Sequence, residues 1–162
     1  MKPVTLLLLP PVVAALALLA ATPTAARQDP RAWVLFDDAP QPYLQYGKRV
    51  GADPDATQIG CSGRRGVMTV TQSFKFNPKR MGATGLMTIY SGAKDLEISA
   101  RASADAHDGR RTVLEADLAA ASPMMASFGK TGDLRLAALG TNVRPPAAPM
   151  DMVGKLMRIC GR

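Results

Sequence analysis

The stretch LEISARASADAHDGRRTVLEADLA, residues 96–119, decides the fold class of this chain. Residues 96–104 alternate apolar and polar side chains, which is the period of a strand with one buried face. Residues 112–119 alternate in the same way. Between them, Asp108-Gly109 is a dipeptide typical of a two-residue hairpin turn. We therefore predict that residues 96–104 and 112–119 pair as antiparallel strands.

Several other segments carry a strand pattern and are separated by turn-forming residues. The longest, residues 67–76, places Met68, Val70, Phe74 and Phe76 on one face. Shorter strands are predicted at residues 32–36, 44–46, 57–61, 85–92 and 133–139. The pattern predicts a mainly β fold, an antiparallel sandwich or partly open barrel of about six to eight short strands. A mixed α+β sheet is the alternative.

One or two short helices complete the predicted fold. Ser122-Pro123 resembles an N-cap followed by a proline in the first turn, and this helix would end before Gly129. At the C-terminus, the apolar residues of the segment 150–160 recur at helical spacing. They are Met150, Val153, Leu156, Met157 and Cys160. That helix would place Cys160 against the sheet.

The N-terminus has the pattern of a secretory signal. Lys2 precedes an apolar run over residues 4–21, and Thr24-Ala25-Ala26 supplies small residues for cleavage. Pro10-Pro11 interrupts the run, which favours a processed signal over the alternative of an uncleaved membrane anchor. We predict a signal peptide at residues 1–26 and a single exported β-rich domain at residues 27–162, located in the periplasm or outside the cell.

The chain contains two cysteines, Cys61 and Cys160. In an oxidising compartment an even pair of cysteines is expected to form a disulfide. Catalysis by a Cys61 thiolate is disfavoured, because the single histidine, His107, lies in a predicted turn. The surrounding GCSGRRG also differs from a phosphate loop, since it leads into a strand and lacks the Walker spacing.

Basic residues outnumber acidic ones, 20 to 13, which gives a net charge of +7. Three basic pairs fall in predicted loops and could share one end of the sheet if the hairpins are aligned. Such a patch would attract an anionic polymer or an acidic protein partner, and a membrane only by surface attraction. Aromatic residues do not interleave with it, so nucleic-acid binding is not predicted. Its residues are Arg64, Arg65, Lys79, Arg80, Arg110 and Arg111.

Methionine and carboxylate side chains suggest further chemistry. Methionines recur at Met124-Met125 and in the last predicted helix. Thioethers suit Cu(I), although methionine is also an adaptable core residue. The acidic residues Asp37-Asp38, Asp53, Asp55, Asp105 and Asp108 lie in predicted loops without calcium-loop spacing, and are expected to be solvated turns. We predict no metal or organic cofactor.

Four features together resemble small exported bacterial proteins of unassigned function. They are the early Trp33, Tyr43 after a proline loop, Cys61 before a strand, and a terminal helix ending in Cys160. The resemblance implies a disulfide-closed β-domain and transfers no activity. The sequence favours a non-enzymatic binding module of the cell envelope, because it shows no nucleophile–base pair and no metal cluster. The alternatives are a structural or stress-related envelope component and a methionine-based copper protein.

Overall fold

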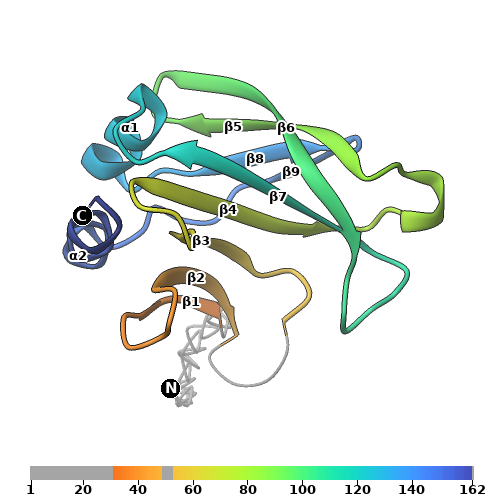
Figure 1. Ribbon diagram of the computed structural model, residues 1–162, viewed down its shortest axis with the longest axis horizontal. Helices are drawn as coiled ribbons and strands as arrows, with labels where there is room; N and C mark the ends of the chain where they lie inside the picture. The colour runs from red at the N-terminus through yellow and green to blue at the C-terminus, as the bar shows by residue number, and fades with distance from the viewer. Residues whose placement is uncertain (1–30, 49–52, 162) are drawn as a thin grey trace, which may run out of the picture.

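The fold is a single antiparallel sheet of nine strands that curls into a half-barrel, with two short helices at one end (Figure 1). The computed structural model describes residues 31–48 and 53–161, so the predicted signal peptide lies outside the described residues. Of the two architectures predicted, the partly open barrel is confirmed and the sandwich is not. The strands are β1 (Arg31–Phe36), β2 (Tyr43–Lys48), β3 (Thr57–Cys61), β4 (Val67–Phe74), β5 (Thr84–Ser91), β6 (Lys94–Ala104), β7 (Thr112–Ala119), β8 (Arg135–Ala138) and β9 (Thr141–Val143).

The strand order is β1-β2-β3-β4-β7-β6-β5-β8-β9, so β1 and β9 are the two edges of the sheet. A single turn of 3-10 helix, η1 (Pro78–Arg80), follows β4. Helix α1 (Pro123–Thr131) connects β7 to β8, and helix α2 (Met150–Cys160) ends the described chain. Each pair of neighbouring strands is antiparallel, as the alternating polar and apolar pattern predicts.

The predicted pairing around residues 96–119 is confirmed. Strands β6 and β7 pair from Ala104↔Thr112 to Arg101↔Glu115. The predicted two-residue turn at Asp108-Gly109 is wrong, because the connection spans residues 105–111. The backbone N–H of Asp105 donates to the carbonyl of Arg111 at 3.0 Å and closes this wider loop.

Both predicted helices are present. The Ser122 hydroxyl accepts a hydrogen bond from the Met125 N–H at 3.3 Å, the N-cap geometry that the sequence predicts. The helix continues past Gly129, where it was predicted to end, to Gly132. There φ is 64°, a left-handed conformation that favours glycine.

Helix α2 packs its buried Val153, Leu156 and Cys160 toward the concave face of the sheet, near β1, β2 and β3. Met150 was predicted to belong to this apolar stripe, but it is 45% exposed. It occupies the first turn, beyond the part of the helix that the sheet covers. A hydrophobic core of buried side chains from the sheet and both helices fills this end of the half-barrel.

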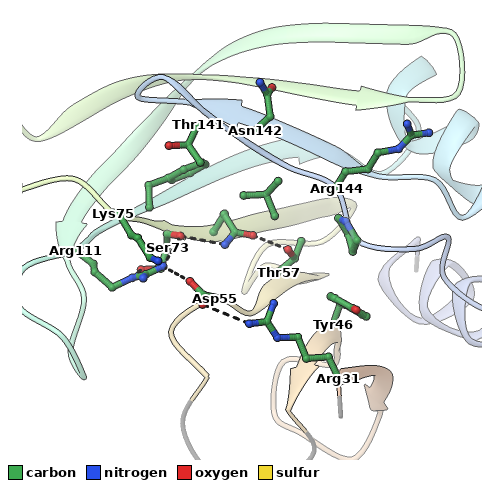
Figure 2. A pocket seen from close by; sticks show the side chains of 14 residues that line it. Arg31, Tyr46, Asp55, Thr57, Ser73, Lys75, Arg111, Thr141, Asn142 and Arg144 are labelled. Atoms are coloured by element: carbon green, nitrogen blue, oxygen red, sulfur yellow. Dashed lines mark hydrogen bonds and ion pairs between the residues drawn. The ribbon is translucent and has the colours of Figure 1, made fainter. Parts of the chain in front are cut away.

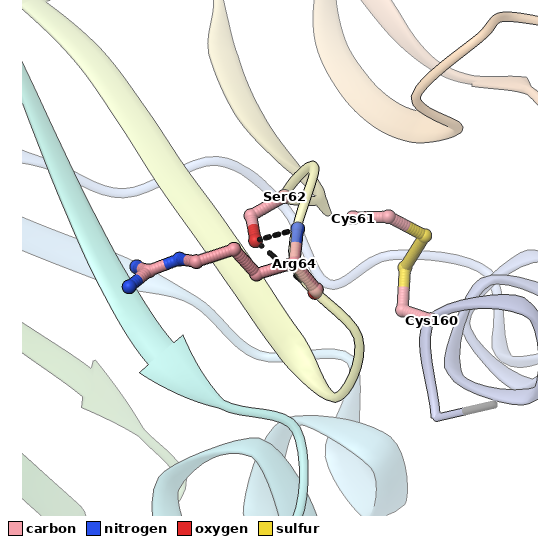
Figure 3. Close-up of a disulfide and its surroundings, with 4 residues drawn as sticks. All are labelled: Cys61, Ser62, Arg64 and Cys160. Atoms are coloured by element: carbon pink, nitrogen blue, oxygen red, sulfur yellow. Dashed lines mark hydrogen bonds between the residues drawn. A yellow bond between two sulfur atoms is a disulfide. The ribbon is translucent and has the colours of Figure 1, made fainter.

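The disulfide predicted from the cysteine count is confirmed. It joins Cys61 at the end of β3 to Cys160 at the end of α2, with an S–S distance of 2.08 Å (Figure 3). The sequence separation is 99 residues. The bond therefore fixes the C-terminal helix onto the sheet across most of the domain.

We predict that replacing both cysteines, Cys61→Ala/Cys160→Ala, lowers the free energy of unfolding by about 4 kcal/mol, because a long closed loop restricts the unfolded chain. Urea unfolding of the variant and of the oxidised wild type measures the difference. Ellman titration of denatured, unreduced wild type is the control and should find no free thiol. Equal unfolding midpoints would contradict the prediction.

Candidate functional site

A pocket of about 440 Å³ opens on the concave side of the half-barrel, at the end remote from the helices (Figure 2). The direction of β4 shows this placement: Met68 pairs with the disulfide-bonded Cys61 near α2, whereas Phe74, at the other end of the strand, lines the pocket. One wall comes from β1 to β4. The facing wall comes from β9 and residues 144–145.

Basic side chains dominate the charge of the pocket. Arg31, Lys75, Arg111 and Arg144 line it, and Asp55 is the one carboxylate among the described residues that do so. Arg31 and Arg111 both pair with Asp55, at 3.4 and 2.6 Å. Basic residues therefore outnumber carboxylates in the described lining, and Asp53, 3.8 Å from Arg31, and Asp105, which accepts from the Ser73 hydroxyl beside Arg111, balance part of this charge.

Arg111 is the central residue of the pocket. Only 6% of it is exposed, and its Nη2 donates to the Pro54 carbonyl, the Asp55 carboxylate and the Ser73 carbonyl at 3.0, 2.6 and 3.2 Å. Its Nε donates to the Ser73 hydroxyl at 3.0 Å. Nη1 takes part in none of these bonds. Arg111 thus keeps part of its guanidinium available while the rest is fixed.

The buried carboxylate of Asp105 is linked to Arg111 through the Ser73 hydroxyl. The Ser73 hydroxyl donates to Asp105 at 2.7 Å, and the N–H groups of His107 and Asp108 donate to the other oxygen of Asp105 at 2.8 and 3.3 Å. Burial raises the pKa of Asp105, but these hydrogen bonds outweigh burial and hold the pKa below its ordinary value. Asp105 therefore stays ionised and orients Ser73, which in turn contacts Arg111.

The pocket floor is polar because of the strand register. Tyr46 pairs with Thr57, and Thr57 with Gln72, so three polar side chains share one row of the concave face. Thr57 donates its hydroxyl hydrogen to the Gln72 side-chain carbonyl, and the Gln72 amide donates to the Ser73 carbonyl at 3.1 Å. These buried groups satisfy one another and give a fixed floor.

Polar side chains on both walls lack partners among the described residues. The side chains of Lys75, which follows β4, and of Thr141 and Asn142 in β9 form no hydrogen bond or ion pair with the described residues, and all three are exposed. The Asn142 side chain points away from the cavity (Figure 2), as its register opposite Ala137 requires. Arg144 is 71% exposed and has a distant ion pair of 4.0 Å to Asp133. Lys75 and Thr141 are free to contact a ligand.

The six predicted patch residues do not gather at one end. Arg64 and Arg65 occupy the β3–β4 hairpin, beside the end of β7, whereas Lys79 in η1 and Arg110 and Arg111 in the β6–β7 loop lie at the opposite end of the sheet. Arg80 lies in η1. The single shared patch is therefore not formed, because β4 separates the two groups along its length. Arg111 is also buried in the pocket, where a solvated loop residue was expected.

Arg64 belongs instead to an ionic cluster on the outer face of the sheet. Asp117 accepts from Arg64 at 2.6 Å and from Arg101 at 2.9 Å, and Arg101 also pairs with Glu115 at 2.7 Å. The hydrogen bond from Arg101 lowers the pKa of Asp117 below its ordinary value. These ion pairs join the β3–β4 hairpin to β6 and β7.

Other residues that the sequence singled out as candidates lie in loops or in the hydrophobic core, outside the described lining of the pocket. His107 is exposed in the β6–β7 loop, as expected, and Met124 and Met125 are buried in the core. Asp53 and Asp105 were expected to be solvated but are almost fully buried. In the described part of the chain, no group of three or more His, Cys, Asp or Glu side chains is placed to hold a metal ion.

None of the described helices has the length and apolar character needed to cross a bilayer. No known family model, curated protein or solved structure matches this chain.

We predict that Asp105→Asn lowers stability at pH 7 by about 1–3 kcal/mol, the cost of disturbing a buried, hydrogen-bonded charge. A carboxylate whose folded pKa is lowered stabilises the fold above its unfolded pKa of about 4 and loses that effect as the pH falls further. Urea unfolding at pH 7 and pH 3 should show that the difference from wild type shrinks at pH 3. Asp95→Asn, at an exposed position on β6, is the control. An unchanged difference at both pH values would refute the assignment.

Proposed function

We propose that this protein is an exported, non-enzymatic binding module that receives an anionic small molecule, or the anionic end of a polymer, in the pocket of the half-barrel. The single observation behind this proposal is the charge of the cavity: four basic side chains and one carboxylate surround about 440 Å³. This volume lies within the range of small-molecule sites, about 300–1,000 Å³.

Electrostatics supports an anionic ligand. Arg111 is held by the buried Ser73 and by the half-exposed Asp55, so it needs no reorganisation to present Nη1. Lys75 and Arg144 are exposed at the rim and can close on a bound anion. The net charge of the whole chain, +7, would also raise the rate at which anions reach the pocket at low salt.

Binding is favoured over catalysis by the one hydroxyl–carboxylate pair at the pocket, Ser73 and Asp105. A general base works best when its pKa lies near the working pH. The pKa of Asp105 is lowered, so its carboxylate is a weak base for the Ser73 proton. The pair instead orients Arg111 through the Ser73 hydroxyl.

Export is supported by two observations. The N-terminal sequence has the composition of a signal peptide. The Cys61–Cys160 disulfide is of the kind that forms and persists in oxidising compartments.

We predict that citrate, acetate or inorganic phosphate shifts the amide NMR signals of residues lining the pocket, and that added NaCl weakens the effect. The variant Lys75→Gln/Arg144→Gln should bind about tenfold more weakly, a loss of ~1.4 kcal/mol. Lys79→Gln/Arg110→Gln is the matched control, because it removes the same charge from exposed residues outside the pocket. An equal loss in both variants, or no shift with any anion, would contradict the proposed function.

A further inference from the structure

We infer that the ligand of this pocket is a hexuronic acid, a sugar that carries a carboxylate, either free or at the end of an acidic polysaccharide. This inference rests on the proposed function and specifies its ligand. It follows from the size of the pocket, the polar groups of its walls and the manner in which it presents positive charge.

The pocket is too large for a simple anion. An inorganic anion or acetate is only a few times the size of a water molecule, which occupies about 30 Å³ of liquid. The cavity measures about 440 Å³. A ligand that buries most of its surface here therefore has the size of at least one sugar ring.

The walls offer both kinds of surface that a sugar ring needs. Thr141 of β9 has an unpartnered hydroxyl within the described residues, and its register opposite the buried Ala138 places it on the inner face, where it can donate to and accept from ligand hydroxyls. Tyr46, Val143 and Pro145 add apolar area that can pack against the C–H face of a ring. The pocket thus combines a neutral wall with basic side chains.

The positive charge suits a carboxylate better than a phosphate. Phosphate sites commonly use helix N-termini or glycine-rich nests of backbone N–H groups. Both helices lie at the other end of the half-barrel, and none of the described residues lining the pocket is a glycine. Two guanidinium groups already shared with Asp55, those of Arg31 and Arg111, and the exposed Lys75 and Arg144 remain.

The two recognition elements come from different walls. Arg111 is anchored beside Ser73 and Asp55, while Thr141 belongs to the edge strand β9, as Figure 2 shows. A ligand with its carboxylate and its hydroxyls on opposite sides would contact both walls at once. A hexuronate has this layout, since its carboxylate projects from one end of a hydroxylated ring.

Isothermal titration of the purified, oxidised protein tests the inference with D-glucuronate, D-glucose, acetate and glucose 6-phosphate. We expect glucuronate to bind at least about tenfold more tightly than each of the others, a difference of ~1.4 kcal/mol. Equal binding of acetate and glucuronate, or tighter binding of glucose 6-phosphate, would overturn the inference and leave the proposed function intact. Failure of every anion to bind would overturn both.

A trimer of galacturonate distinguishes the two sources of the ligand. Tighter binding of the trimer than of galacturonate indicates the end of a polymer, and equal binding indicates the free sugar. Either result supports a hexuronate site. Binding of neither would overturn it.

A variant test separates the sugar contacts from the charge. Thr141→Val removes the hydroxyl with little change in shape and should weaken glucuronate binding about five- to tenfold, as the loss of one hydrogen bond worth ~1 kcal/mol does. Acetate binding should not change. Thr84→Val, at an exposed position on β5 outside the pocket, is the matched control. Unchanged glucuronate affinity in Thr141→Val would overturn the assignment of the β9 wall.

Discussion

The buried guanidinium of Arg111 is the interaction on which the open end of this fold depends. It donates to the loop before β3 through Pro54 and Asp55, and to β4 through Ser73. Ser73 then donates to Asp105, which organises the loop between β6 and β7. Three segments far apart in the sequence are therefore held by one side chain. A buried charge is tolerated only where it is paired and hydrogen-bonded, so this network is a structural joint in which Asp55 and Asp105 balance the charge of Arg111.

Different interactions stabilise the two ends of the half-barrel. At the helical end, apolar side chains of the sheet, α1 and α2 form the core, and the Cys61–Cys160 bond fixes α2 in place. At the open end, the concave face becomes polar at Thr57 and Gln72, and the sheet edges β1 and β9 are not paired with each other. Helix α2 and the core close one end, so the half-barrel leaves its cavity at the other. Because the apolar core occupies the helical end, the walls of the pocket at the open end consist of hydrogen-bonded polar groups and charged side chains.

Local sequence patterns predicted much of the fold. Strand patterns in the sequence identified eight of the nine described strands outright or in part, including the β6–β7 pair, because one face of each is buried against the core. Ser122-Pro123 and the cysteine count predicted a helix start and the disulfide. Strand β9 was missed, because three residues before a proline pair are too few for alternation to show. Arg111 was misassigned because its burial depends on Ser73 and Asp55, which only the tertiary fold brings near. One feature of the sequence could have indicated the pocket. Gln72 interrupts the otherwise apolar face of β4, and a polar residue at such a position often faces a binding site.

A single structure can test directly the proposal that an anion binds to the side of Arg111 that carries Nη1. A crystal structure of the oxidised protein with D-glucuronate should show the ligand carboxylate about 2.7–3.2 Å from Nη1 of Arg111, with its hydroxyls toward Thr141. Electron density for the sugar elsewhere on the molecule, such as the groove between β1 and α2 lined by Trp33 and Met152, with the Arg111 pocket holding only water, would contradict it.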